Sequence, residues 1–256
     1  MAIDSSDPDY VNALARGLAI ITAFGHNSEA LSLSDVAEKT RLSRGTARRF
    51  LLTLESLGYL RFDGKTFRLT PKTLDLGYSY LSSLPLLKAA HPIMQDVVSK
   101  LGESCALGVL DGHDVVYIAR IPPKTFSFIN VPIGTRMPAH LNAMGQVLLS
   151  ELSEGELEIY LSVARLPATT KFALVDPAAI RKQIARVAKD QYAISDQQLQ
   201  IGMRSIAVPV RSRSGRTDVA INIAAGDKPV SKKELIDGYL PVLRQAAFQI
   251  GQAIYT

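Results

Sequence analysis

The chain has 256 residues, 47% of them hydrophobic, and a formal net charge of +5 at neutral pH. This length fits two domains with a sizeable core, and no apolar run reaches the length of a membrane span. The single cysteine excludes an internal disulfide and a cysteine-rich zinc site, and the acidic start Met1–Asp9 lacks the form of a signal peptide. We therefore expect a cytoplasmic protein with two domains and no membrane partner.

The start of the chain predicts three helices, of which the second and third are joined by a tight turn. The first runs from about Tyr10 to Phe24, and the helix pair begins at Leu33. In the third helix, apolar residues recur with the spacing of one buried stripe: Ala47, Phe50, Leu51 and Leu54. The far side is short, positively charged and not needed for the core: Gly45, Arg48, Arg49 and Thr53. Such a side suits a helix laid into the major groove of DNA.

A hairpin follows the helix pair. Residues 58–69 read as two alternating strands with Asp63-Gly64 at the tip. Helix, turn, helix and hairpin in this order make a winged helix-turn-helix. Between Lys39 and Lys72 nine basic residues stand against two acidic ones, a net +7, whereas the whole chain carries +5. The alternative is an ordinary helix pair with solvated arginines, but this concentration of positive charge favours contact with phosphates.

We expect the recognition helix and the hairpin to supply the contacts to DNA. Ser43 is the expected N-cap, which leaves exposed N–H groups able to meet a phosphate. Arg44 and Arg48 are candidates for bidentate bonds to guanine edges, and Arg49 for a phosphate. The remaining candidates are two residues of the recognition helix, one of which permits close backbone approach, and two of the hairpin: Gly45, Thr46, Lys65 and Arg68. For each arginine the alternative is a solvated or intraprotein ion pair.

The rest of the chain predicts a connecting helix and then a mixed domain. The connecting helix covers residues 72–81, and the next helix, Leu86–Leu101, contains Pro92, which must kink it or mark its first turn. Six strands are expected: 104–110, 115–120, 126–131, 193–198, 205–210 and 219–225. Four helices are expected between and after them: 142–152, 154–164, 177–190 and 232–254. This grouping indicates an α+β fold with a mostly antiparallel sheet flanked by helices.

Short motifs over almost the whole chain carry a family resemblance. Those in the first domain are Leu14-Ala-Arg-Gly-Leu18, Arg48-Arg-Phe-Leu-Leu-Thr-Leu54, Leu57-Gly-Tyr59, Leu69-Thr-Pro71 and Leu74-x-Leu-Gly77. Those in the second are Val116-Tyr-Ile-Ala-Arg120, Gly134-Thr-Arg-Met-Pro-Ala139, Gly145-x-Val-Leu-Leu149 and Gly202-Met-Arg-Ser-Ile-Ala-Val-Pro-Val210. With these motifs the chain resembles the IclR family of bacterial transcription regulators. Within the family it resembles the subgroup that controls aromatic-acid breakdown through the β-ketoadipate pathway.

The resemblance implies a DNA-binding transcriptional regulator, not an enzyme, that senses a small aromatic or dicarboxylic acid. It implies a winged helix-turn-helix at residues 1–70, a linker helix at 71–84 and a GAF-like effector domain at 85–256. It also implies homodimers, often paired into tetramers, on palindromic double-stranded operators. No cofactor is implied.

The resemblance further places the effector between residues 134–145 and the later strands. Carried over residue by residue, it nominates His140, Asn142, Ala143, Asp196, Met203, Ser205 and Asn222. Met137 adds apolar surface, and Arg120 and Arg136 are candidates to pair with a ligand carboxylate, because a guanidinium fork matches that geometry. The alternative for each is an ordinary structural role, such as a satisfied interior histidine or an arginine in an ion pair.

One hypothesis of another class remains open, in which the second domain is a hydrolase and the winged helix only an interaction module. Its sharpest form uses Cys105 or Ser205 with His140, but no Gly-x-Ser-x-Gly motif ties these residues together. Cys105 is expected to fill space in a strand, and the four histidines form no pair at metal-ligand spacing. We therefore expect no catalytic, metal or cofactor site.

Overall fold

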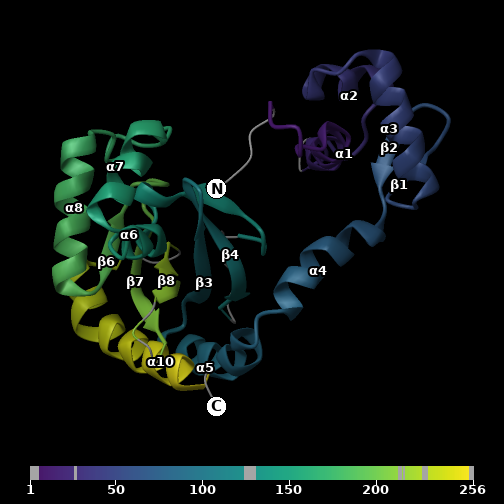
Figure 1. Ribbon diagram of the computed structural model, residues 1–256. Coiled ribbons are helices and arrows are strands. Elements are labelled where there is room, and N and C mark those ends of the chain that lie inside the picture. Colours follow the sequence, from purple (N-terminus) through teal and green to yellow (C-terminus); the bar gives the residue numbers. More distant parts are fainter. Residues whose placement is uncertain are drawn as a thin grey trace. The chain divides into compact units, whose positions relative to one another are not determined.

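The computed structural model describes residues 6–25, 28–123, 131–212, 215, 217–226 and 230–253. The chain divides into two compact units, residues 1–83 and 84–256 (Figure 1). Within the described ranges, none of the helices has the length and apolar character that crossing a membrane requires.

The first unit contains three helices and a two-stranded hairpin: α1 (Asn12–Ala23), α2 (Leu33–Thr40), α3 (Arg44–Ser56), β1 (Leu60–Phe62) and β2 (Phe67–Leu69). Ser32 and Asp35 form a capping box at the start of α2, and Arg41 ends that helix in the left-handed conformation at φ 55°. Ser43 caps α3 by accepting a hydrogen bond from the Thr46 N–H at 3.2 Å. The predicted winged helix-turn-helix is confirmed.

A connecting segment follows the hairpin. It consists of a 3₁₀ turn, Pro71–Thr73, and α4 (Leu74–Ser82), a helix in which no side chain is buried. The second unit then begins with α5 (Leu86–Leu101). Pro92 lies inside α5, six residues after its start, so it does not mark the first turn as one of the two expectations had it.

The second unit is built on a six-stranded sheet in which every pair of neighbours is antiparallel. The strands are β3 (Ser104–Asp111), β4 (Asp114–Ile121), β5 (Arg136–Pro138), β6 (Ala193–Asp196), β7 (Arg204–Arg211) and β8 (Thr217–Ala225). Their order is β5-β4-β3-β8-β7-β6. The strand expected at 126–131 lies almost wholly outside the described residues. The edge strand β5, which pairs with β4, was not expected, because it has only three residues and ends in proline.

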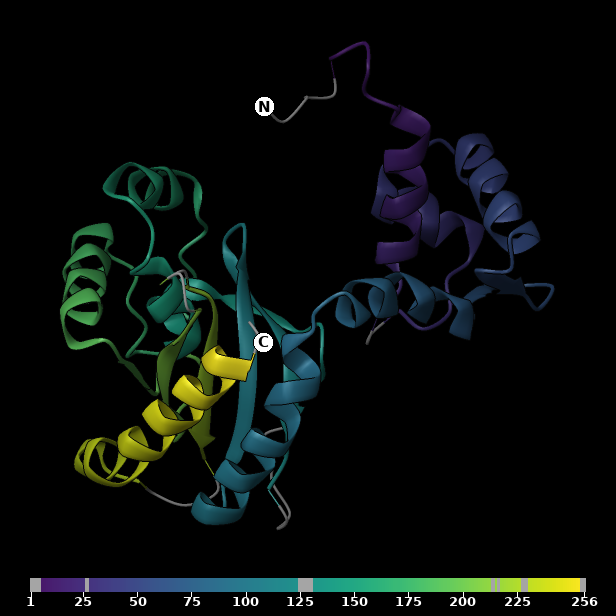
Figure 2. The same ribbon diagram turned by 60° about the horizontal axis from the view of Figure 1, so that its bottom comes forward.

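Helices cover both faces of this sheet. Helix α5 and the C-terminal helix α10 (Leu240–Ala253) lie side by side on one face (Figure 2). Helix α6 (Ala143–Leu149) packs on the other face, with α7 (Glu154–Val163) and α8 (Pro177–Asp190) outside it (Figure 1). The helix expected at 232–254 is divided into α9 (Lys232–Glu234), a π-helical segment (Leu235–Tyr239) and α10. The α+β architecture is confirmed.

The strand register decides which side chains share a face. Ala106 of β3 pairs with Arg120 on one side and with Asn222 on the other, and Asn222 pairs with Ala207. These four side chains therefore point to one face, which is the face that α6 covers. Their immediate neighbours along the strands, such as Cys105, point to the face covered by α5 and α10.

Candidate functional site

The side of α3 opposite its buried stripe is exposed and basic. Arg44, Arg48 and Arg49 are all exposed, and none of them forms an ion pair within the described part of the chain. A Cβ atom at Gly45 would meet nothing within 4 Å, so the fold itself does not require glycine there. Thr46 is half-buried, and its hydroxyl accepts a hydrogen bond from the Ser43 hydroxyl at 2.9 Å. The predicted contact residues of α3 thus form one accessible surface.

The tip of the hairpin is held by Asp63. Its carboxylate accepts hydrogen bonds from the N–H groups of Lys65 and Thr66 at 2.9 and 2.7 Å, and from the Thr66 hydroxyl. These bonds, that from the Thr66 N–H above all, lower the pKa of Asp63 to about 2. Gly64 takes φ +94° at the turn, and Lys65 is exposed beside it. The hairpin therefore presents a lysine from a rigid turn.

Arg61 belongs to this basic surface although it was not among the predicted contacts. It pairs across the hairpin with Arg68, and both side chains are exposed on the face opposite Phe67. Two like charges directly opposite each other disfavour the hairpin, and the Asp63 carboxylate, 4.0 Å from Arg68 Nε, offsets part of this repulsion. The alternation of Leu60, Arg61 and Phe62 was the signal in the sequence that could have identified it. Lys72, in contrast, donates to the Leu57 carbonyl at 2.9 Å.

In the second unit, polar side chains gather under the N-terminus of α6. Asn142 caps that helix by accepting from the Met144 N–H at 2.9 Å, and its Nδ2 donates to the Tyr117 hydroxyl at 2.9 Å. The Tyr117 hydroxyl also forms a hydrogen bond with the Asn222 side chain, and burial raises the pKa of Tyr117. Asn142 and Asn222 are 1% and 2% exposed. We call Tyr117, Asn142 and Asn222 the polar cluster.

Four more predicted residues border the polar cluster. Arg120 is half-buried on the same face of the sheet as Asn222, and its burial lowers the pKa of its guanidinium. Ser205 is buried on that face too, two residues before Ala207 on β7. The Met137 sulfur lies 3.6 Å from Asn142 Nδ2, and Ala143 follows Asn142 with its side chain buried. The structure therefore brings six of the predicted residues together: Arg120, Met137, Asn142, Ala143, Ser205 and Asn222.

His140 lies two residues before Asn142 and is 1% exposed. Its Nδ1 atom is 3.3 Å from the Tyr160 hydroxyl, whereas its Nε2 atom is buried with no hydrogen-bond partner in the described part of the chain. Burial lowers the pKa of His140 to about 4, so the ring is neutral at pH 7. A buried ring nitrogen without a partner is uncommon, because its desolvation is not compensated. It is therefore a candidate to bond a ligand.

Side chains that sequence reasoning missed hold this segment in place. Gln146 is fully buried, and its Nε2 donates to the His140 carbonyl at 2.9 Å and to Gln198 Oε1 at 3.3 Å. The Ser195 hydroxyl donates to the Leu141 carbonyl at 2.6 Å. Spacing along the chain gave no signal for the contacts of Gln146 with Gln198 and of Ser195 with Leu141, since they join residues 52 and 54 positions apart.

Three of the predicted effector residues lie elsewhere. The Arg136 guanidinium is ion-paired with Asp111 at 2.6 Å and Asp114 at 3.1 Å on the exposed hairpin of β3 and β4. Asp196 is ion-paired with Arg204 at 2.6 Å and with Lys232. Met203 lies in the turn between β6 and β7. These four ion pairs already satisfy the charges of Arg136 and Asp196, so the geometry does not favour a ligand role for either.

The geometry also gives the enzyme hypothesis no support. Cys105 points to the face of the sheet opposite α6, and burial raises the pKa of its thiol to about 12, which suppresses the thiolate. His140, on the α6 side, therefore cannot activate it. Neither ring nitrogen of His140 bonds Ser205, since Nδ1 meets the Tyr160 hydroxyl and Nε2 has no partner in the described residues. Among the described residues, no group of three or more His, Cys, Asp or Glu side chains could hold a metal ion.

Comparison with known families gives matches to both units. Residues 13–64 match the IclR helix-turn-helix domain, and residues 78–252 match the family described as bacterial transcriptional regulator IclR C-terminal. The two matches together span most of the chain.

Individual relatives resemble the chain over most of its length. The Pca regulon regulatory protein of Pseudomonas putida is 37% identical, with 95% of this chain and 84% of that protein covered. The p-hydroxybenzoate hydroxylase transcriptional activator of Acinetobacter baylyi is 36% identical, with 94% and 91% covered. A solved structure, the double mutant of the PobR inducer-binding domain of Acinetobacter in complex with 3-hydroxybenzoic acid, is 28% identical with a TM-score of 0.61. It covers 64% of this chain and 97% of that one.

Proposed function

The chain belongs to the IclR family of bacterial transcriptional regulators, and we propose that it senses a small aromatic acid and thereby controls genes of aromatic-acid catabolism. The p-hydroxybenzoate hydroxylase transcriptional activator supports this choice of ligand class, and so does the complex of the PobR double mutant with 3-hydroxybenzoic acid. A dicarboxylic acid of the same catabolism is the second candidate. Since operator DNA is the target, the protein acts in the cytoplasm.

The observation that carries the ligand proposal is the polar face beneath α6. Protein interiors seldom leave polar groups without partners, yet His140 Nε2 is buried and unpaired within the described residues. A hydroxyl on the ligand ring satisfies this nitrogen, and the half-buried guanidinium of Arg120 attracts the ligand carboxylate. Asn142, Asn222 and Ser205 add hydrogen-bonding groups, and Met137 and Ala143 add apolar contact.

For DNA, we propose that α3 enters the major groove and that the hairpin lies on the backbone. Arg44 and Arg48 contact guanine edges, whereas Arg49 contacts phosphate. Ser43, Gly45 and Thr46 bring the first turn of α3 close to the DNA backbone, as the exposure of Ser43 and Gly45 permits. Lys65 and Arg68 contact phosphates from the hairpin, and Arg61 joins them.

We further propose that the chain pairs with a second copy through α1 and α4. Helix α1 exposes Val11, Leu14 and Leu18 on one side, with 63%, 63% and 48% of these side chains accessible. Helix α4 buries none of its residues although it carries Leu74 and Tyr78, which are 73% and 70% exposed. Such apolar surface suits a second copy, which a palindromic operator would require. Pairing of dimers into tetramers is the further expectation.

Operator titrations test the function. Labelled DNA from upstream of the protein's own gene is titrated with the full chain at several salt concentrations, with and without 4-hydroxybenzoate. We expect tight binding. The logarithm of the affinity should fall linearly with the logarithm of salt concentration, and the affinity should change when the acid is added. Scrambled DNA of equal length is the control. Equal binding to both DNAs, or no effect of any of protocatechuate, 4-hydroxybenzoate, β-ketoadipate and muconate, contradicts the proposal.

A further inference from the structure

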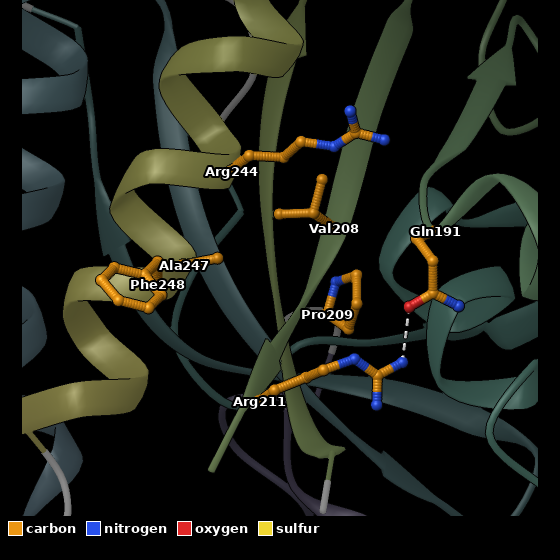
Figure 3. Close-up of a pocket in the computed structure, with 7 residues that line it drawn as sticks. All are labelled: Gln191, Val208, Pro209, Arg211, Arg244, Ala247 and Phe248. Atoms are coloured by element: carbon orange, nitrogen blue, oxygen red, sulfur yellow. Dashed lines mark hydrogen bonds between the residues drawn. The ribbon is translucent and has the colours of Figure 1, made fainter. Parts of the chain in front are cut away.

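A pocket lies in the effector unit and shares no residue with the polar cluster. Its volume is about 200 Å³, and its lining comes from β7, α10 and the end of α8: Gln191, Val208, Pro209, Arg211, Arg244, Ala247 and Phe248 (Figure 3). The pocket exists because β6 pairs with β7 only as far as Ala207. Among the described residues, no strand therefore pairs with residues 208–211 of β7 on that side, and α10 forms the other wall.

The two arginines of this pocket differ in their bonding. Arg211 donates to Glu151 at 2.6 Å, to Gln191 at 2.6 Å and to Thr217 at 3.0 Å, so its charge is neutralised and its position fixed. Arg244 makes one hydrogen bond, from Nη2 to the Asp190 carbonyl at 3.1 Å, and its guanidinium lies 5.9 Å from the centre of the Tyr192 ring. Its Nε and Nη1 protons have no partner in the part of the chain that the structure describes.

The remaining lining is apolar. Val208, Pro209 and Ala247 form the base between the two guanidiniums, and Figure 3 shows Arg244 and Arg211 on opposite sides of them. Phe248 lies at the rim of the pocket, beyond Ala247 in Figure 3, and is 68% exposed. A volume of about 200 Å³ is smaller than the roughly 300–1,000 Å³ of pockets for drug-sized ligands, so it suits a ligand with one ring.

We propose that this pocket is a second ligand site, which binds a small carboxylate with an apolar body through Arg244. The carboxylate accepts hydrogen bonds from the free protons of Arg244, and the apolar body covers Val208, Pro209 and Ala247. Arg211 bounds the site and adds little charge, since Glu151 neutralises it. An apolar base favours an organic acid over inorganic phosphate, because phosphate oxygens that face the base would find no hydrogen-bond donors there. The proposal rests on the pocket alone and not on the proposed effector role of the polar cluster.

A tryptophan placed at the pocket reports on it directly, because the chain contains no tryptophan. The full chain with Phe248→Trp is titrated with benzoate at constant ionic strength, and benzyl alcohol serves as the neutral analogue. We expect a saturable change in tryptophan emission with benzoate and none with benzyl alcohol. Adding Arg244→Gln should weaken benzoate binding at least about tenfold, because a charge-assisted hydrogen bond is lost. Arg165→Gln, the same change at an exposed arginine outside the pocket, should leave it unaltered.

A second reporter separates local from general effects. Phe172→Trp, at another exposed phenylalanine of this unit, should show no saturable response to benzoate through the pocket. The proposal is overturned if Arg244→Gln leaves the titration unchanged, if both reporters respond equally, or if benzyl alcohol acts like benzoate. It is also overturned if the emission of the tryptophan at position 248 does not change with benzoate but shifts when the protein is diluted. Such a shift would mean that a second copy covers the pocket. The fluorescence titration does not involve operator DNA, so its result can be interpreted even if the operator titrations contradict the proposed function.

Discussion

The fold does not require glycine at position 45, so a substitution there tests whether DNA binding does. Because a Cβ there would meet nothing within 4 Å in the protein, Gly45→Ala should stabilise α3 by roughly 0.5–1 kcal/mol. The same methyl group would obstruct close approach of the helix start to DNA, so operator affinity should fall several-fold. Urea unfolding and operator titration of one preparation measure both effects. Unchanged affinity in a stabilised variant would show that the backbone does not approach DNA at this position.

His140 should make the stability of the effector unit depend on pH. Burial lowers its pKa to about 4 in the folded chain, against about 6.5 when unfolded. Between these values the unfolded state binds more protons, so the free energy of unfolding rises with pH. The contribution of the neutral His140 to stability is complete above about pH 6.5. As the pH falls from 6.5 towards 4, stability should decrease by up to about 1 kcal/mol per pH unit.

His140→Gln removes this titration and keeps a neutral side chain with hydrogen-bonding groups. Urea unfolding of the two proteins between pH 5 and 7.5 should therefore give a smaller pH dependence for the variant. Equal slopes for the two proteins would mean that His140 is not held neutral by burial. The variant should also bind 4-hydroxybenzoate more weakly if Nε2 meets the ligand hydroxyl.

Residue types and local spacing predicted the helix cap and the basic exposed side of α3, but partners far along the chain could not be predicted. Ser43 as a helix cap and the exposed arginines of α3 follow from local pattern alone. Asn142 and His140 were nominated by family resemblance, whereas Tyr117 and Gln146, which position them, come from strand register and tertiary contact. Arg136 was nominated for a ligand carboxylate but forms ion pairs with Asp111 and Asp114. The strand pairing that brings these residues to it cannot be read from the sequence around Arg136.

At the scale of elements, the hairpin should act as an electrostatic contact rather than as a reader of sequence. The double substitution Arg61→Ala/Arg68→Ala should weaken binding to operator and to scrambled DNA by similar factors. It should also reduce the slope of log affinity against log salt concentration by about 2, since each lost phosphate contact changes the slope by about 0.9. Lys88→Ala, on α5 of the other unit, is the control. An unchanged salt slope would show that the hairpin arginines do not meet phosphates.

Long elements were predictable because their periodicity is strong, and short ones were not. Helix α8 was predicted with its bounds, from a cap at Asp176 followed by Pro177. Strand β5 was missed because three residues pairing at a sheet edge carry no alternation. The helix expected at 142–152 was wrong in detail: a 3₁₀ turn at Ala139–Leu141 precedes α6, and α6 ends at Leu149. Gly145 permits this compact entry, since a Cβ there would lie 2.2 Å from the Ala139 carbonyl oxygen.

The connecting segment is fastened to the end of the recognition helix. The Thr70 hydroxyl donates to the Gly58 carbonyl at 2.5 Å, and Lys72 donates to the Leu57 carbonyl at 2.9 Å. Lys72 also lies 5.2 Å from the centre of the Tyr59 ring. A change in the direction of α4 therefore acts on the C-terminal end of α3. Within the first unit, this is a physical route for the ligand-dependent control that we propose.

For the whole molecule, ligand and operator must influence each other equally. If an aromatic acid changes operator affinity by some factor, the operator must change affinity for the acid by the same factor. This reciprocity is independent of whether the protein activates or represses transcription.

The number of chains on an operator is the remaining question at this scale, and α1 allows a direct test of it. Leu14→Glu/Leu18→Glu places two charges on a side of α1 that is exposed in the single chain, so folding should be little affected. If a second copy covers this side, burying the charges costs several kcal/mol, and sedimentation equilibrium should show monomers. Operator affinity should then fall at least a hundredfold, because two half-sites are no longer bound together. Ile159→Glu on α7, where the side chain is 66% exposed, makes a matched change in the other unit and should leave assembly and binding intact. A double variant that still forms dimers would exclude this side of α1 as the pairing surface.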